Sequence, residues 1–148
     1  MIDKVISVVM EQQQDYQIRI NFGADVPSLL ADEPAPLGQG SGPSPMHLLC
    51  SAVGTCLTDS LLFALRKFKQ QPEPLGCTVE ADVGRNEAGR LRVLAMRAHL
   101  RLGVPAEQLA HLDRVLEQFE QFCTVTQSVG QGIPVTVSVS DAMGKLLK

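Results

Sequence analysis

The stretch SPMHLLCSAVGTCLTDSLLFALRKF, residues 44–68, is the strongest helix signal in the chain. Ser44 is a preferred helix N-cap, Pro45 suits the first helical turn, and Gly54 is the one helix-weakening residue in the run. Residues 46–65 have the length of a membrane span, about 20 residues, but they include His, Ser, Thr and Asp. We therefore expect the buried helix of a soluble protein and no membrane association.

The segment before this helix predicts a hairpin and a loop. Residues 5–10 and 17–22 are short β-prone runs joined by a polar turn. Residues 23–44 contain repeated Pro and Gly, which exclude a long regular element. Residues 23–44 are therefore expected to form a loop that ends at Ser44, where the helix begins.

The segment after the helix predicts a second hairpin and a second helix. Residues 77–83 and 94–102 alternate apolar and polar side chains, which indicates two strands with one solvated face. Pro105 opens an amphipathic helical pattern that reaches Phe122. Residues 124–129 are ambiguous, and residues 135–139 alternate as a last strand. The order ββαββα(α)β predicts an α+β fold.

Length and composition restrict the function. A chain of 148 residues with 45% hydrophobic and 20% charged residues predicts one globular domain spanning 1–148. The net charge of −3 and the single Tyr with no Trp do not favour nucleic acid binding. Asp3 and Glu11 interrupt the N-terminal apolar run, so we expect no secretory signal and a cytoplasmic location, where thiols stay reduced.

Four cysteines, Cys50, Cys56, Cys77 and Cys123, are the candidates for chemistry. Cys50 and Cys56 are six residues apart on the predicted helix, which separates them by roughly 9 Å along the axis and about 240° around it. That separation excludes a disulfide between them and a shared site. Cys50 and Cys77 are interpreted as small core residues, which is the usual place of a free cysteine.

Cys56 stands in a different context, because small and polar residues surround it and leave room for a substrate. Cys123 lies at the junction between the second helix and a Thr-rich run, so it could resolve an oxidised Cys56 if the fold brings them together; a structural role for both stays open. His47 and Cys50 have a spacing that suits two metal ligands, but no CxxC motif completes a shell, so neither a metal nor another cofactor is expected.

Two longer motifs resemble a known family. GSGPSPMHLLCSAVGTC, residues 40–56, combines a Gly-Pro-rich loop, a Ser-Pro helix start and a Cys about three turns inside the helix. FCTVTQSVGQGIPVTVSV, residues 122–139, places a second Cys at the start of a Cys-x-Val-Ser/Thr motif before the last strand. Together they resemble the OsmC/Ohr family of thiol-dependent peroxidases, in its OsmC-like branch, over nearly the whole chain.

The resemblance implies an intertwined homodimer with two sites at the subunit interface. It also implies reduction of organic hydroperoxides, with Cys56 as the peroxidatic thiol, Cys123 as the resolving thiol, and an external dithiol as reductant. The apolar residues Leu48, Leu49, Val53 and Leu57 are expected to wall the substrate site.

This chain departs from the active members of that family where they hold an Arg against the thiolate with a Glu. Met46 occupies the position of that Glu, and His47 follows where the branch often has Glu. Arg19 is the one N-terminal Arg and lies in the second predicted strand. Without a guanidinium, Cys56 keeps a pKa near the free value of about 8.5, so we expect slow turnover that rises with pH unless His47 or Arg19 activates the thiol.

Two other functions fit the same residues. The chain could be a non-catalytic dimer that binds a small ligand, or a redox sensor whose Cys56–Cys123 disulfide changes the binding of a partner. The fold alone does not choose among these functions and the peroxidase.

Overall fold

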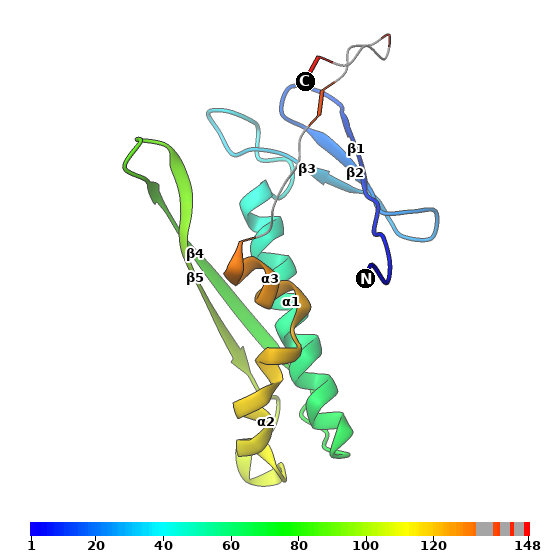
Figure 1. Ribbon diagram of the computed structural model, residues 1–148, viewed down its shortest axis with the longest axis vertical. Helices are drawn as coiled ribbons and strands as arrows, with labels where there is room; N and C mark the ends of the chain where they lie inside the picture. The colour runs from blue at the N-terminus through cyan, green and yellow to red at the C-terminus, as the bar shows by residue number, and fades with distance from the viewer. Residues whose placement is uncertain (133–137, 140–142, 144–146) are drawn as a thin grey trace.

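The computed structural model describes residues 1–132, 138–139, 143 and 147–148. The described residues form two antiparallel sheets and three α-helices, of which α1 is the longest and the others lie beside it (Figure 1). The α+β fold class is therefore confirmed. The expected last strand at residues 135–139 lies largely outside the described residues.

Helix α1 spans Pro45–Lys67, in agreement with the sequence prediction. Ser44 caps it, and its hydroxyl accepts a hydrogen bond from the backbone N–H of His47. A row of residues four apart, which lie on one helix face, forms the buried stripe Val53, Leu57, Leu61 and Leu65. By length and composition alone, α1 is long and apolar enough to cross a membrane, but core helices of soluble proteins have the same properties. In this chain, 28% of the most apolar window of α1 is buried. Much of the other side of α1 is uncovered in the single chain.

The N-terminal sheet has the order β1-β2-β3 and lies at the N-terminal end of α1 (Figure 1). Its strands are β1 Val9–Gln12, β2 Ile18–Asn21 and β3 Leu29–Ala31. The predicted hairpin exists, but its strands are shorter, and the Pro-Gly segment contains the three-residue β3. Strand β3 ends immediately before Asp32, whose carboxylate accepts backbone hydrogen bonds from the following loop.

The second hairpin pairs β4 Gly76–Arg85 with β5 Leu91–Arg101 and packs beside α1. Its solvated face carries the predicted charges, and Arg97 forms hydrogen-bonded ion pairs with Asp82. The apolar alternation of β5 breaks at one point, because a register shift between Asp82 and Val83 pairs Val83 with Val93. Leu94 is consequently 60% exposed rather than in the apolar face.

The C-terminal segment is less regular than the sequence predicted. Instead of one helix from Pro105 to Phe122, it forms η1 Ala106–Gln108, α2 Leu112–Gln118 and η2 Phe119–Phe122. His111 adopts a left-handed φ of 62°, through which an α-helix does not continue. The apolar spacing still predicts the buried face, since Leu109, Val115 and Phe119 join the α1 stripe in the core.

Cys123 follows η2 and is the N-cap residue of α3, Thr124–Gln131. The ambiguous run after Cys123 is thus helical. Helix α3 lies along α1, which brings the start of α3 to the middle of the long helix (Figure 1). This contact positions the candidate site.

Candidate functional site

The fold brings Cys56 and Cys123 together. Cys56 is on α1 and packs at the edge of the core cluster, whereas Cys123 belongs to that cluster and has 0% exposure. Both cysteines are free thiols in the structure. The two thiols are close enough for hydrogen bonding between them to shift the pKa of each.

The two thiols differ in acidity. Burial raises the pKa of Cys56, and hydrogen bonding with Cys123 and the charge of Cys123 raise it further. Burial also opposes ionisation of Cys123, but hydrogen bonds from the Cys56 thiol and from the hydroxyl and backbone N–H of Thr126 lower its pKa overall. Because the two thiols interact, they titrate as a pair.

Three groups of the chain help to hold the pair. Cys123 Sγ lies 3.1 Å from Thr126 Oγ1. The backbone N–H of Val125 hydrogen-bonds Cys56, and the Ser60 hydroxyl contributes to both thiols, in each case favouring the thiolate. The first turn of α3 thus presents hydrogen-bond donors to both sulfur atoms. The positive end of the helix dipole at this turn also stabilises negative charge.

Cys56 lines a cavity of about 440 Å³ between α1 and the α2–η2 segment. Four phenylalanines contribute to its apolar lining. Polar and charged residues line the same cavity. The expected wall of Leu48, Leu49, Val53 and Leu57 is wrong for this cavity, because none of the four lines it. Leu49, Val53 and Leu57 instead line a different cavity with β5 and α3. The reason is their position around the helix: Val53 and Leu57 belong to the buried stripe of α1, whereas Cys56 lies on a neighbouring face that borders η2. The cavity phenylalanines are Phe63, Phe68, Phe119 and Phe122.

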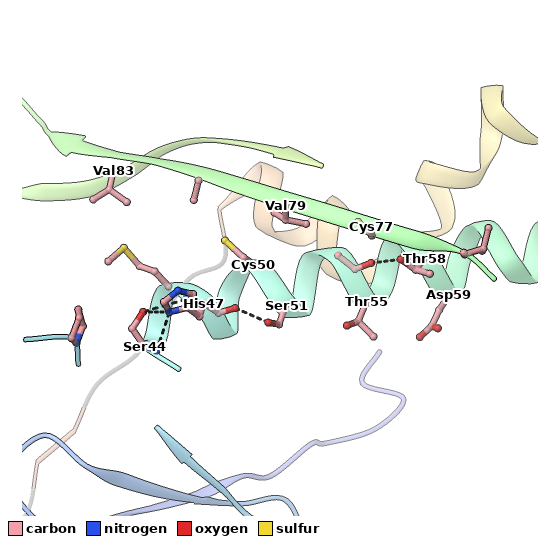
Figure 2. A pocket seen from close by; sticks show the side chains of 15 residues that line it. Ser44, His47, Cys50, Ser51, Thr55, Thr58, Asp59, Cys77, Val79 and Val83 are labelled. Atoms are coloured by element: carbon pink, nitrogen blue, oxygen red, sulfur yellow. Dashed lines mark hydrogen bonds between the residues drawn. The ribbon is translucent and has the colours of Figure 1, made fainter. Parts of the chain in front are cut away.

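Cys50 and Cys77 belong to a separate cavity of about 800 Å³ between α1 and β4 (Figure 2). The Cys50 side chain points toward β4, and Cys77 lies near the start of that strand (Figure 2). Cys50 and Cys56 therefore open onto different sides of α1, as their spacing predicted.

The residues considered as activators do not reach Cys56 within one chain. Met46 and His47 line the cavity of Cys50, and His47 is nine residues, or roughly 13 Å along α1, from Cys56. His47 Nδ1 instead accepts a hydrogen bond from the backbone N–H of Ser44 at 3.1 Å, completing a capping box. Arg19 lies in β2, paired with Glu11 and Leu30, and is not among the residues lining the Cys56 cavity.

Sequence reasoning missed Ser60 and Thr126. Ser60 is four residues after Cys56, which places it on the same helix face. Thr126 is three residues after Cys123, which is the spacing of a helix N-cap and the residue it contacts, and this signal was available in the run CTVT. It was overlooked because the β-branched residues of that run left its secondary structure ambiguous.

Comparison with known proteins identifies the fold. The family model described as OsmC-like protein matches residues 38–138. An OsmC-like protein from Mycoplasma pneumoniae is 14% identical, with a TM-score of 0.71 over 89% of this chain and 91% of that chain. No curated protein has a matching sequence.

Two further solved structures bear the name organic hydroperoxide resistance protein. The one from Legionella pneumophila is 12% identical, with a TM-score of 0.65 over 87% of this chain and 91% of that chain. The one from Elizabethkingia anophelis is 16% identical, with a TM-score of 0.64 over 85% of this chain and 89% of that chain. The family match over most of the sequence and the shared fold show that this chain belongs to the OsmC-like protein family.

Proposed function

We propose that this protein is a thiol-dependent peroxidase that reduces organic hydroperoxides. The observation that carries the proposal is the pair itself: Cys56 opens onto an apolar cavity while Cys123 is buried beside it, within hydrogen-bonding reach. Structural relatives named organic hydroperoxide resistance proteins support it.

In this reaction Cys56 is the attacking thiol, because it lines the cavity whereas Cys123 is fully buried. The Cys56 thiolate attacks the distal peroxide oxygen, the O–O bond breaks, and a sulfenic acid and an alcohol result. Cys123 then attacks the sulfenic sulfur, forms the disulfide and releases water. A cytoplasmic dithiol reduces this disulfide and completes the cycle.

The cavity favours organic over hydrogen peroxide as substrate. Phe63 and Phe122 are 72% and 74% exposed in the single chain, so an apolar alkyl or aryl group can pack on them. Hydrogen peroxide has no group that gains from this contact. We therefore expect faster reduction of cumene hydroperoxide than of hydrogen peroxide.

The test is peroxide consumption by purified protein with dithiothreitol, together with peptide mapping of disulfides. Cys56→Ser is expected to abolish turnover, and Cys123→Ser to prevent the intramolecular disulfide. Cys50→Ser and Cys77→Ser are the matched controls and should retain activity. Mapping after one equivalent of peroxide should find Cys56 bridged to Cys123.

Three results would contradict this proposal. Turnover that survives Cys56→Ser would remove the proposed site. Oxidation by a single equivalent without turnover would instead favour the redox sensor, and no reaction at all would favour a ligand-binding dimer.

A further inference from the structure

We propose that the Cys56 cavity contains an anion subsite, formed by Lys67 and Arg114 at the end away from the thiol. The preferred substrate is then an organic hydroperoxide that also carries a carboxylate or a phosphate, with an apolar chain between its two ends. This inference deepens the proposed peroxidase function and, as a statement about substrate, rests on it.

The two cations lie at the same end of the cavity. Lys67 is the last residue of α1 and lines the cavity together with Cys56 and Arg114. It is eleven residues after Cys56, or roughly 16 Å along the helix axis. Arg114 is in α2, beside the C-terminal end of α1 (Figure 1), and its guanidinium lies 5.9 Å from the ring centroid of Phe68, the residue after Lys67. The cavity therefore has a thiol toward one end and two positive charges toward the other.

Both cations are available to a ligand. Within the described part of the chain, neither Lys67 nor Arg114 forms an ion pair, whereas Arg66 in the same turn as Lys67 pairs with Glu73. A cation in the last turn of α1 complements the helix dipole, which explains Lys67 without a ligand. Arg114 is different, because it is in the first turn of α2, where the dipole disfavours a cation. A bound anion supplies the negative charge that this position lacks.

A carboxylate in the same cavity favours one orientation of the substrate. Asp59 is three residues after Cys56 on α1, so the two residues are neighbours on the helix surface, and both line the cavity. Asp59 repels an anionic group beside the thiol, whereas Lys67 and Arg114 attract the same group at the far end. The charges therefore leave the hydroperoxide, rather than the anionic group, at Cys56.

An apolar chain fits between the two ends. Phe63 lies between Cys56 and Lys67 along α1, and Phe119 and Phe122 of η2 line the same cavity. The cavity volume of about 440 Å³ is within the usual range for small-ligand sites. A long hydroperoxide with a charged end can contact the thiol, the rings and the cations together. A short or neutral hydroperoxide leaves the cations unpaired.

The experiment compares a linoleic acid hydroperoxide with the hydroperoxide of its methyl ester, which has the same chain and no charge. Steady-state reduction with dithiothreitol gives kcat and KM for both, and wild type should have the higher kcat/KM for the acid. In the double variant Lys67→Gln/Arg114→Gln, kcat/KM for the acid should fall about tenfold, because two partly exposed ion pairs are lost. The fall should be in KM with kcat unchanged, since the cations lie far from the reacting atoms. The ester should change by less than about twofold.

Lys69→Gln is the matched control for the loss of positive charge. Lys69 is two residues after Lys67 but lines a different hollow, together with Arg66 and Glu73. This variant should reduce both substrates as wild type does. An equal loss for acid and ester in the double variant would assign Lys67 and Arg114 a structural role. An equal loss in Lys69→Gln would assign the effect to overall charge, and either result overturns the inference.

Titration calorimetry with unreactive ligands tests the subsite independently of turnover. Decanoate, decyl phosphate and decanol share one chain and differ in the head group. Wild type should bind at least one of the two anions more tightly than decanol, and their comparison shows which head group the subsite prefers. The double variant Lys67→Gln/Arg114→Gln should bind all three alike.

The two measurements separate this inference from the proposed function. Equal binding of the three ligands by wild type would remove the subsite whatever the activity. If wild type reduces neither hydroperoxide but binds an anion through Lys67 and Arg114, the peroxidase is contradicted and the anion subsite is supported. If it reduces acid and ester equally well, the peroxidase is supported and the substrate preference is overturned.

Discussion

Asp32 shows how one buried carboxylate shapes the approach to the site. It is 2% exposed and accepts hydrogen bonds from the backbone N–H groups of Glu33 at 2.8 Å, Gln39 at 3.2 Å and Ser41 at 2.9 Å. These bonds, that from Ser41 foremost, lower the pKa of Asp32. The folded loop therefore holds the ionised carboxylate, and the same loop ends at Ser44, the cap of α1.

We predict that Asp32→Asn lowers the thermal unfolding midpoint by several degrees at neutral pH, because an amide presents a donor to N–H groups that need an acceptor. A lowered folded-state pKa contributes stability above the ordinary carboxyl pKa of about 3.9, and this contribution is lost as pH falls through the folded value. The difference between wild type and variant should therefore shrink on acidification from neutral pH. Calorimetry over this pH range checks it.

The matched control is Asp25→Asn, which changes an exposed carboxylate in the turn between β2 and β3. Its midpoint should follow wild type at every pH. An equal effect of the two substitutions would show that overall charge, rather than the Asp32 hydrogen bonds, determines the loss.

At the scale of an element, the start of α1 depends on the capping box of Ser44 and His47. The backbone N–H of Ser44 donates to His47 Nδ1, so this nitrogen is unprotonated and the proton of the neutral ring is on Nε2. The Ser44 hydroxyl lies 2.8 Å from the same nitrogen. His47 thus acts where Glu or Gln usually completes such a box.

We predict that His47→Ala destabilises the fold by about 1 kcal/mol, because the Ser44 N–H loses its acceptor. His47→Glu should instead be stabilising by about 0.3–1 kcal/mol, since a carboxylate both accepts this bond and favours the helix N-terminus. Urea denaturation measures both. His99→Ala, on the exposed face of β5, is the control and should be neutral; a His47→Glu variant less stable than His47→Ala would contradict the capping role.

At the scale of the whole molecule, the isolated chain leaves apolar surface uncovered. The α1–β4 cavity is about 800 Å³, and small residues Ser51 and Thr55 face its open side (Figure 2). Exposed apolar side chains also lie on the N-terminal arm and at the far end of the β4–β5 hairpin. They include Ile2, Val5, Ile6, Leu91 and Leu94.

We predict a homodimer in solution, in which a second copy covers this surface. Light scattering should give twice the chain mass of 16.0 kDa at micromolar concentration. Thr55→Arg should shift the protein toward monomer, because a long charged side chain blocks close approach to α1. Glu87→Arg, at the exposed hairpin turn, is the control, and a monomeric wild type would rule out a shared interface.

The sequence by itself determined the elements with strong local signals. Helix α1, its Ser44 cap and the β4–β5 hairpin follow from apolar spacing, capping chemistry and alternation, which act between near neighbours. The family motifs also singled out Cys56 and Cys123. The single domain over 1–148 and the chemical roles of the two thiols stay predictions.

Only the tertiary structure decided how the site is built. Three departures from the sequence expectation are the break at His111, the bulge that leaves Leu94 exposed and the helical form of α3. Helix α3 in turn sets Thr126 and Val125 against the thiols, and gives Cys123 rather than Cys56 the lowered pKa. The acidity of a thiol depends on burial and on donors that arrive from other elements, so no pattern along the chain contains it.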